Sequence, residues 1–190
     1  MKKIIPIDSY QPSPTDRFLF DNNILMYIFC PLGNYHPAVV RSYSLFLKQI
    51  LKSGSSLFTT SLIISEFFNS CIRLEYNQLR GSAPKRYQEF KRDYRSTDKF
   101  LHDAEIYKDI ILRKILAVMK KIDDHFMQID SELLLRGVDN SFDFNDRILQ
   151  AIATVDDLII VTNDSDFSTG PFDTRIITGN KRLLGYYIKP

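Results

Sequence analysis

Leu158-Ile159-Ile160-Val161 is the stretch that decides the fold class, and Thr162-Asn163-Asp164 follows it directly. Four consecutive apolar residues, most of them β-branched, are typical of a parallel strand that is buried on both faces of a sheet. Such a sheet needs helices on both sides to cover it. The stretch therefore predicts the α/β class.

Weaker strand signals occur along the rest of the chain. Phe18-Leu19-Phe20, Leu57-Phe58-Thr59 and residues 126–129 and 174–178 are expected to be strands. Between them, apolar residues recur at spacings of three and four, as on the buried side of a helix. Strands that alternate with helices predict βαβ units and a three-layer α/β/α sandwich with a mostly parallel sheet of about five strands.

The 190 residues are expected to form one domain with an N-terminal extension. Residues 1–16 contain three of the eight prolines and no clear periodicity, so we expect an extended arm there. The single domain would then span residues 17–185.

A long helical pair is expected within that domain. Residues 68–122 have an almost continuous helical pattern, which Gly81 and Pro84 interrupt. In the second helix, Ile106 and Ile110 are expected on the buried side. The pair would extend the domain as a helical hairpin insertion.

The composition indicates a soluble globular protein, with 44% hydrophobic and 25% charged residues. A net charge of +2 is too small to argue for nucleic-acid binding from bulk charge.

Cys30 and Cys71 lie in apolar runs without metal-binding spacing, so we expect buried free thiols and a reducing compartment. No apolar run approaches the roughly 20 residues that span a bilayer. We expect a cytoplasmic protein without membrane contact.

Acidic residues occur where parallel strands end. Asp21 and Asp164 follow the first and the strongest strand, Glu66 lies in the helix after the second strand, and Asp146 begins the helix before the strongest strand. Because ligands bind at the carboxyl ends of parallel strands, we expect these acids in one cleft. Clustered carboxylates repel one another unless a cation is present, and Mg²⁺ prefers oxygen ligands. The pattern predicts a divalent-metal site that could activate water and stabilise charge on a phosphate.

Four blocks of sequence together resemble a known family. They are FLFDNNIL (18–25), TSLIISEF (60–67), NDRILQAIA (145–153) and IVTNDSDF (160–167). Their order and spacing are similar to those of PIN domains, over roughly residues 16–180. The resemblance implies a parallel sheet flanked by helices, Mg²⁺ or Mn²⁺, and endonucleolytic cleavage of RNA. Many small bacterial members, including those of the VapC type, are toxins of toxin–antitoxin pairs, which implies an antitoxin partner.

The resemblance also assigns roles to individual residues. The implied catalytic metal ligands are Asp21, Glu66, Asp146 and Asp164. Asp143 is an alternative to Asp146, and Asp166 is an alternative to Asp164 or an acid behind it. Thr162 and Asn163 could orient Asp164 or a metal-bound water.

A separate basic segment could contact RNA. Residues 73–99 hold eight basic and four acidic residues, with aromatic residues interleaved. The candidate contacts are Lys85, Arg86, Lys91, Arg92 and Arg95. Exposed aromatic rings would stack on bases, whereas inward-packed rings would indicate an ordinary solvated helix. Exposed apolar faces in this segment would suit a homodimer.

The leading hypothesis is a Mg²⁺- or Mn²⁺-dependent endoribonuclease that hydrolyses RNA phosphodiester bonds, as the toxin of a toxin–antitoxin pair. The alternative is a non-catalytic module that binds RNA or protein on the same scaffold. A phosphatase-like hydrolase with Asp21 as nucleophile is disfavoured, because the second Asp of an Asp-x-Asp pair is replaced by Asn23.

Overall fold

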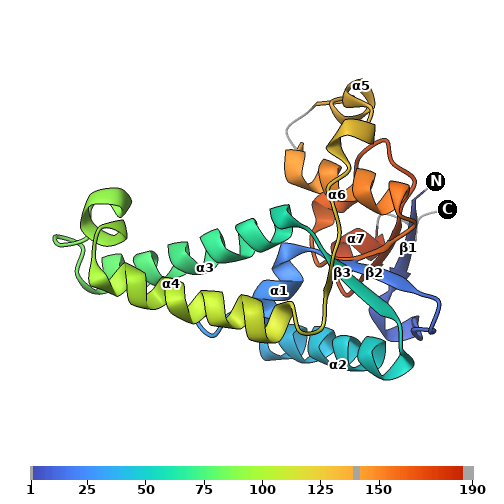
Figure 1. Cartoon of the computed structure of the whole chain (residues 1–190). Helices are drawn as coiled ribbons and strands as arrows, with labels where there is room; N and C mark the ends of the chain where they lie inside the picture. Colours follow the sequence, from blue (N-terminus) through green and yellow to red (C-terminus); the bar gives the residue numbers. More distant parts are fainter. Residues whose placement is uncertain (1, 139–141, 186–190) are drawn as a thin grey trace.

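The computed structural model describes residues 2–138 and 142–185, and within these ranges six parallel strands form one sheet in the order β1-β6-β5-β2-β3-β4 (Figure 1). The strands are β1 (Lys3–Pro6), β2 (Arg17–Phe20), β3 (Ser56–Thr59), β4 (Lys120–Lys121), β5 (Ile159–Val161) and β6 (Arg175–Thr178). β5 lies between β2 and β6 and is buried along its whole length, as its apolar run predicts. The α/β class and the parallel sheet are confirmed.

The sheet has six strands in the described ranges rather than about five. β1, which lies in the expected N-terminal arm, pairs in parallel with β6. β4 is only two residues long and pairs with the outer side of β3. The strand expected at residues 126–129 is wrong, because Phe126–Gln128 form a short 3₁₀ helix. His125 has a left-handed backbone, with φ at 51°, and the Asp124 side chain accepts the N–H of Phe126, so the chain turns here.

Helices cover the sheet and connect its strands. They are α1 (Asn22–Phe29), α2 (Pro37–Ser53), α3 (Ser61–Ser82), α4 (Asp98–Ile110), α5 (Ser131–Leu134), α6 (Phe144–Val155) and α7 (Lys181–Gly185). In the view of Figure 1, α2 lies below the sheet and α6 above it, as a three-layer fold requires. Pro37 occupies the first turn of α2, and Gly54, with φ at 78°, ends that helix as a left-handed cap.

The expected helical pair is confirmed. α3 and α4 pack side by side and extend from the sheet as a long arm (Figure 1). The short π-helices Phe90–Arg95 and Ile111–Ile115 precede and follow α4. The expected buried stripe of α4 is only partly right, because Ile110 is buried but Ile106 is 39% exposed. Tyr107 takes the inward position, where its hydroxyl donates to Glu75 Oε1 at 3.0 Å.

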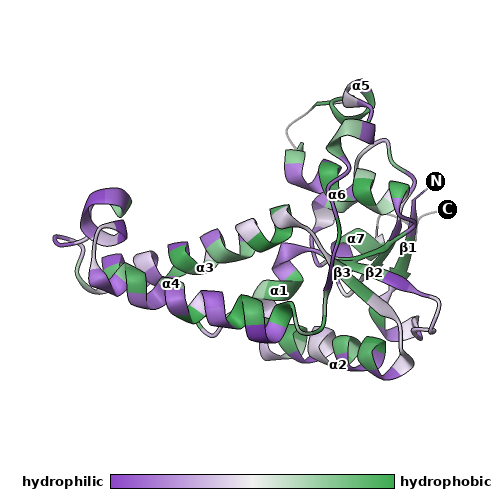
Figure 2. Cartoon of the chain, in the orientation of Figure 1, coloured by the Kyte–Doolittle hydropathy of each residue, from purple (hydrophilic) through white to green (hydrophobic). Residues whose placement is uncertain are grey.

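Apolar residues are concentrated in the strands and on the inner sides of the helices (Figure 2). Cys30 and Cys71 are both buried free cysteines, as expected. None of the helices in the described part of the chain is both long and apolar enough to cross a membrane.

Candidate active site

Asp21 lies at the carboxyl end of β2, in the middle of the sheet. Its backbone N–H donates to Val161 O at 3.0 Å, which extends the hydrogen-bond ladder between β2 and β5 by one residue. Asp21 precedes α1, yet its side chain does not cap that helix. The carboxylate instead accepts hydrogen bonds from Thr162 Oγ1, at 2.7 Å, and from Asn23 Nδ2. This buried carboxylate is therefore held at the sheet edge by two side-chain donors and is not used in a helix cap.

A network of neutral side chains fixes the loop after β5. Asn163 N–H donates to Asn23 Oδ1 at 3.2 Å, and Asn163 Nδ2 donates to Tyr27 OH at 3.1 Å. Tyr43 OH lies 3.0 Å from Asn163 Oδ1 and accepts the N–H of Gly179 at 2.9 Å. Thr162 thus donates a hydrogen bond to Asp21 directly. Asn163 instead donates to Asn23, which in turn donates to Asp21. Tyr43 is buried in α2, and nothing in the sequence around it indicates this polar contact.

Glu66 lies in the second turn of α3 and is partly buried. Asn22 Nδ2 donates to Glu66 Oε1 at 3.2 Å, and the Asn145 side chain also bonds to this carboxylate. Burial raises the pKa of Glu66, and both amides oppose that effect. Asn22 and Asn145 were not singled out in the sequence, although each stands beside a candidate acid.

Asp143 and Asp146, the rival acids of α6, have different surroundings. Asp143 is exposed and caps the helix, with Oδ1 accepting the N–H of Asn145 at 2.8 Å and that of Asp146 at 3.2 Å. Asp146 is partly buried. Burial, followed by the charges of Asp21 and Asp143, raises the pKa of Asp146 to about 9. Asp143 therefore caps α6 and stays exposed, although its charge also raises the pKa of Asp146 and Glu66, whereas the Asp146 carboxylate is the more buried of the two.

Asp164 and Asp166 also differ in their contacts. Asp164 N–H donates to Thr162 Oγ1 at 3.0 Å, and Asp164 Oδ1 accepts the N–H of Asp166 at 3.0 Å. The charge of Asp164 raises the pKa of both Asp21 and Asp146. Asp164 and Asp166 are both exposed, and Asp166 lies in the 3₁₀ turn Ser165–Ser168 that Asp164 caps. The electrostatic coupling thus favours Asp164 over Asp166 as the fourth acid beside Asp21, Glu66 and Asp146.

Burial makes it unfavourable for Asp21, Glu66 and Asp146 all to be ionised at once. Burial raises the pKa of Asp21 to about 7, Thr162 opposes the shift, and the charge of Glu66 adds to it. Lys2 is a nearby cation whose Nζ donates to Phe167 O at 3.0 Å. Burial lowers the pKa of Lys2 to about 8, and the charge of Asp146 acts in the opposite direction. We call Asp21, Glu66, Asp146 and Asp164 together the acidic cluster.

The donor set of the acidic cluster fits a hard divalent cation, because it consists of carboxylate and amide oxygens. Asn22 Oδ1 is buried beside Glu66 and receives no hydrogen bond from the described residues. Among residues 2–138 and 142–185, however, no three His, Cys, Asp or Glu side chains form a group that could hold one ion as they stand. Mg²⁺ often uses one or two carboxylates and keeps several waters. Direct ligation by some acids and water-mediated contact by others would suit this arrangement.

A groove of about 610 Å³ begins at the acidic cluster and runs along α3. Its lining includes Asn22, Asn23 and Glu66 at the cluster end and Arg73 and Asn77 farther along the helix. Tyr27 and Tyr35 form one wall and contact each other edge-on, with ring centroids 4.7 Å apart. The groove offers amides, hydroxyls, aromatic rings, apolar side chains and one cation, and Glu66 is the member of the acidic cluster that lines it.

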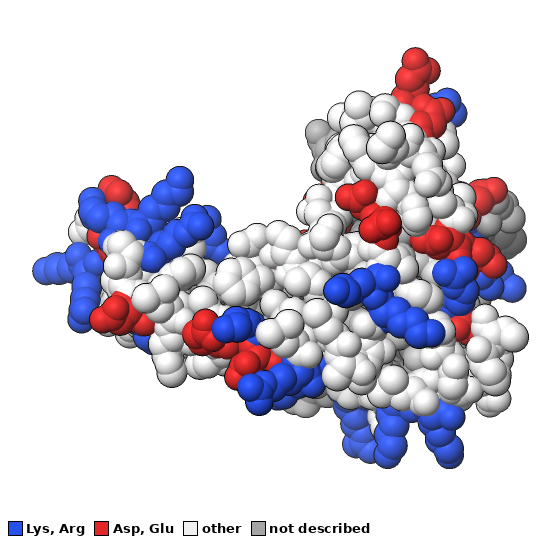
Figure 3. Space-filling model, in the orientation of Figure 1, with Lys and Arg blue, Asp and Glu red and all other residues white. Residues whose placement is uncertain are grey.

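The five candidate RNA contacts lie away from the acidic cluster, at the far end of the α3–α4 arm (Figure 3). Their charged groups are exposed, but Tyr76, Tyr87 and Tyr94 of the same basic segment (residues 73–99) are buried. Base stacking on these tyrosines is therefore excluded, and the inward-packed alternative is correct for the rings.

The fold and the cluster together define an α/β protein with coupled carboxylates at the carboxyl edge of a parallel sheet. A solved structure with a similar fold is that of VapBC2 from Rickettsia felis, bound to a DNA fragment from its promoter. The match has a TM-score of 0.52 and 15% sequence identity, and covers 85% of this chain and 98% of the other. No protein-family model and no curated protein sequence matches the chain.

Proposed function

We propose that this chain is a Mg²⁺- or Mn²⁺-dependent endoribonuclease of the PIN-like type. The observation that carries the proposal is the coupling of carboxylates from four separate segments. Asp21 and Asp146 have pKa values raised to about 7 and about 9, and each is raised in part by Glu66 and Asp164. Strongly raised pKa values at a sheet edge that adjoins a groove are typical of functional sites.

A bound divalent cation would lower the pKa of a coordinated water and stabilise negative charge on a scissile phosphate. Asp21 is held by Thr162 and Asn23 and would present one carboxylate oxygen in a fixed direction. Glu66 is held by Asn22 and Asn145, so its carboxylate is joined to both α1 and α6. Asp146 retains a proton at neutral pH in the absence of a cation, so metal binding would displace protons from the cluster.

RNA is the proposed substrate because the groove beside the acidic cluster combines features that suit a single strand. Tyr27 and Tyr35 could support bases, and Arg73 could contact a phosphate. The fold similarity to a VapBC2 chain supports the same class of activity by analogy. It also supports an antitoxin partner by analogy, whereas the homodimer stays a prediction.

The test is cleavage of RNA by the purified chain with Mg²⁺ or Mn²⁺, and again after removal of metal with a chelator. Asp21→Asn and Asp146→Asn should each reduce the cleavage rate by a factor of a hundred or more, on the order of 3 kcal/mol in barrier height. Asp109→Asn is a matched control, because Asp109 is an exposed acid on α4 that pairs with Arg113 at 3.4 Å. Undiminished cleavage by Asp21→Asn would refute the proposal.

The alternative of a non-catalytic module predicts a different result. Such a chain would bind RNA or metal, yet no RNA would be hydrolysed by the wild-type protein under any metal condition. The acidic cluster favours catalysis over this alternative, because buried carboxylates raise the cost of binding a polyanion unless a cation is present.

A further inference from the structure

One side of α3 carries polar and basic side chains from the acidic cluster to the far end of the hairpin. Residues three or four apart on a helix lie on the same side. We define the α3 stripe as Ser65, Asn69, Arg73, Asn77 and Arg80, all of which are exposed. The first four line the groove that also contains Glu66. The stripe itself contains no acid, so a polyanion that lies along it would contact neutral polar groups and cations.

Arg73 is held in place at the middle of this stripe. Its guanidinium lies over the ring of Phe90, 3.9 Å from the ring centroid. Such stacking fixes the cation and leaves its N–H groups available on the edge of the plane. Phe90 belongs to the end of the hairpin, so Arg73 connects the stripe with that end.

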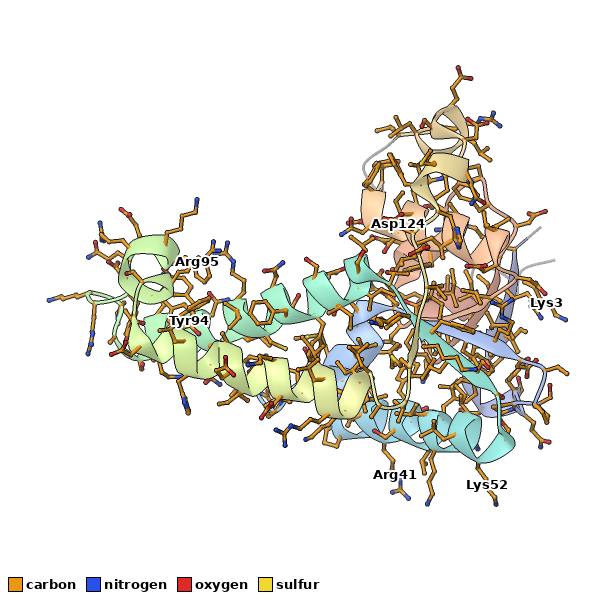
Figure 4. The ribbon with its side chains drawn as sticks, in the orientation of Figure 1. Lys3, Arg41, Lys52, Tyr94, Arg95 and Asp124 are labelled. Carbon is orange, nitrogen blue, oxygen red and sulfur yellow. The ribbon has the colours of Figure 1, made fainter. Side chains whose placement is uncertain are left out.

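The hairpin tip, which we define as residues 80–99, has its aromatic rings inside and its charges outside. Tyr94 is fully buried, and its hydroxyl donates to Asp103 Oδ2 at 2.8 Å. Phe90 packs edge-on against Tyr76, and Phe100 packs edge-on against Tyr94, with ring centroids 5.4 and 5.7 Å apart. Figure 4 shows Tyr94 between the ends of the helices and Arg95 on the outside of the tip. The tip is therefore a small packed unit that presents cations to solvent.

The positive charge of the tip is largely uncompensated. Residues 80–99 hold seven basic and three acidic residues. Two of the acids, Glu89 and Asp93, pair with Arg92, at 3.1 and 2.5 Å. Lys85, Lys91 and Arg95 are exposed, and none of them forms an ion pair within the described ranges. Figure 3 shows the resulting cluster of Lys and Arg at the end of the arm.

The spacing of these cations from the acidic cluster suits a nucleic-acid strand. A helix rises 1.5 Å per residue, so Arg73 lies about 10 Å and Arg80 about 21 Å along α3 from Glu66. Phosphates in a stacked strand are about 3.4 Å apart along the axis, so about six nucleotides cover the distance from Glu66 to Arg80.

We propose that the α3 stripe and the hairpin tip form an extended RNA-binding surface, which holds the phosphate backbone of the strand several nucleotides away from the acidic cluster. The inference rests on the proposed function for the identity of the ligand as RNA. Backbone contacts of this kind give affinity and register without reading sequence. Short RNAs would be bound by the groove alone, and longer RNAs by the groove and the tip together.

The test compares a tip variant with a control variant of equal charge. The tip variant carries Lys85→Gln, Lys91→Gln and Arg95→Gln. The control variant carries the same change at Arg41, Lys48 and Lys52, which are exposed basic residues on α2. Figure 4 shows Arg41 and Lys52 pointing away from the hairpin. Both sets are built in the Asp21→Asn background, in which the RNA stays intact, and binding is measured by fluorescence anisotropy.

For a single-stranded RNA of about 16 nucleotides, the tip variant should bind about tenfold or more weakly, and its salt slope should fall by about 2, at about 0.7 per lost phosphate contact. The control variant should change the affinity less than about threefold. With Asp21 intact, the tip variant should cleave an RNA of about five nucleotides at the wild-type rate, because such a strand does not reach from the cluster to the tip.

Equal affinities of the tip and control variants for the long RNA would overturn the inference. Tighter binding of a duplex DNA of the same sequence, with a larger loss in the tip variant, would also overturn it, because DNA would then be the ligand of the tip. The binding assay is independent of turnover. A chain that cleaves RNA with an inert tip refutes only this inference, and a chain whose tip binds RNA without any cleavage refutes only the proposed activity.

Discussion

Replacement of Asp21 by Asn should stabilise the metal-free protein at alkaline pH. The Asp21 carboxyl is 6% exposed, and its pKa is raised from 3.8 to about 7, first by burial. At 1.36 kcal/mol per pH unit, this difference corresponds to at most about 4 kcal/mol of lost stability at pH 8. The amide keeps an acceptor for Thr162 but fits the Asn23 donor less well, which costs about 1–2 kcal/mol. The net gain should be about 2 kcal/mol, or roughly 4–8 °C in melting temperature.

The sign of the pH dependence follows from linkage. The folded-state pKa of Asp21 lies above its unfolded value, so the unfolded chain releases this proton first as pH rises. The contribution of Asp21 to stability is therefore fully present below pH 4 and is lost between about pH 4 and pH 7. Asp21→Asn should lack this loss. Its stability relative to wild type should fall by about 3 kcal/mol between pH 8 and pH 5, from about 2 kcal/mol more stable to about 1 kcal/mol less stable.

Urea unfolding at pH 5 and pH 8 with a chelator present measures both quantities. Asp109→Asn, which changes an exposed acid, should stay within about 0.5 kcal/mol of wild type at both pH values. Millimolar Mg²⁺ should then stabilise the wild type at pH 8 but have little effect on Asp21→Asn. An Asp21→Asn protein that is destabilised equally at pH 5 and pH 8 would refute the reasoning, because burial of the charge would then not govern this site.

Three further substitutions test separate parts of the structure. Asp143→Ala removes the α6 cap and should cost about 1 kcal/mol in urea unfolding while the response to Mg²⁺ persists; loss of that response would instead make Asp143 a ligand. Tyr43→Phe should lower stability by about 1–3 kcal/mol, because the Gly179 N–H loses its acceptor, and an unchanged melting curve would contradict that contact. Gly170→Ala should be destabilised by more than 1 kcal/mol, because φ is 109° and a Cβ atom would stand 2.7 Å from Gln150 Oε1; wild-type stability would show that Gln150 moves freely.

The central strands and the acids beside them could be predicted because each strand is identified by its own residues. β2, β3, β5 and β6 contain short apolar runs; Asp21 follows β2 directly, and Asp164 is the third residue after β5. For a parallel sheet, the position after a strand then determines the edge at which a side chain lies. The α/β class follows from this local information alone.

The edges of the sheet could not be predicted in this way. β4 consists of two exposed lysines and is a strand only because Thr59 and Phe58 of β3 are available to pair with it. β1 likewise depends on β6, more than 160 residues away in the sequence. Their own residues show no burial pattern, because an edge strand is defined by its neighbour.

The polar partners of the acids and the interior of the hairpin tip also depend on distant contacts. Asn22 and Asn145 meet at Glu66 from different helices, and no spacing in the sequence relates them. In the tip, the mixture of aromatic and basic residues left both exposed and buried rings open. Packing of Tyr94 against the ends of both helices decided that question.

The most direct test of the acidic cluster is the binding of Mn²⁺ at pH 7.5, measured by electron paramagnetic resonance. The account predicts saturable binding to the wild-type chain and to Asp109→Asn, with at least tenfold weaker binding to both Asp21→Asn and Asp146→Asn, about 1.4 kcal/mol or more. Equal Mn²⁺ affinity in the wild type and both cluster variants would contradict the claim that these carboxylates share one cation.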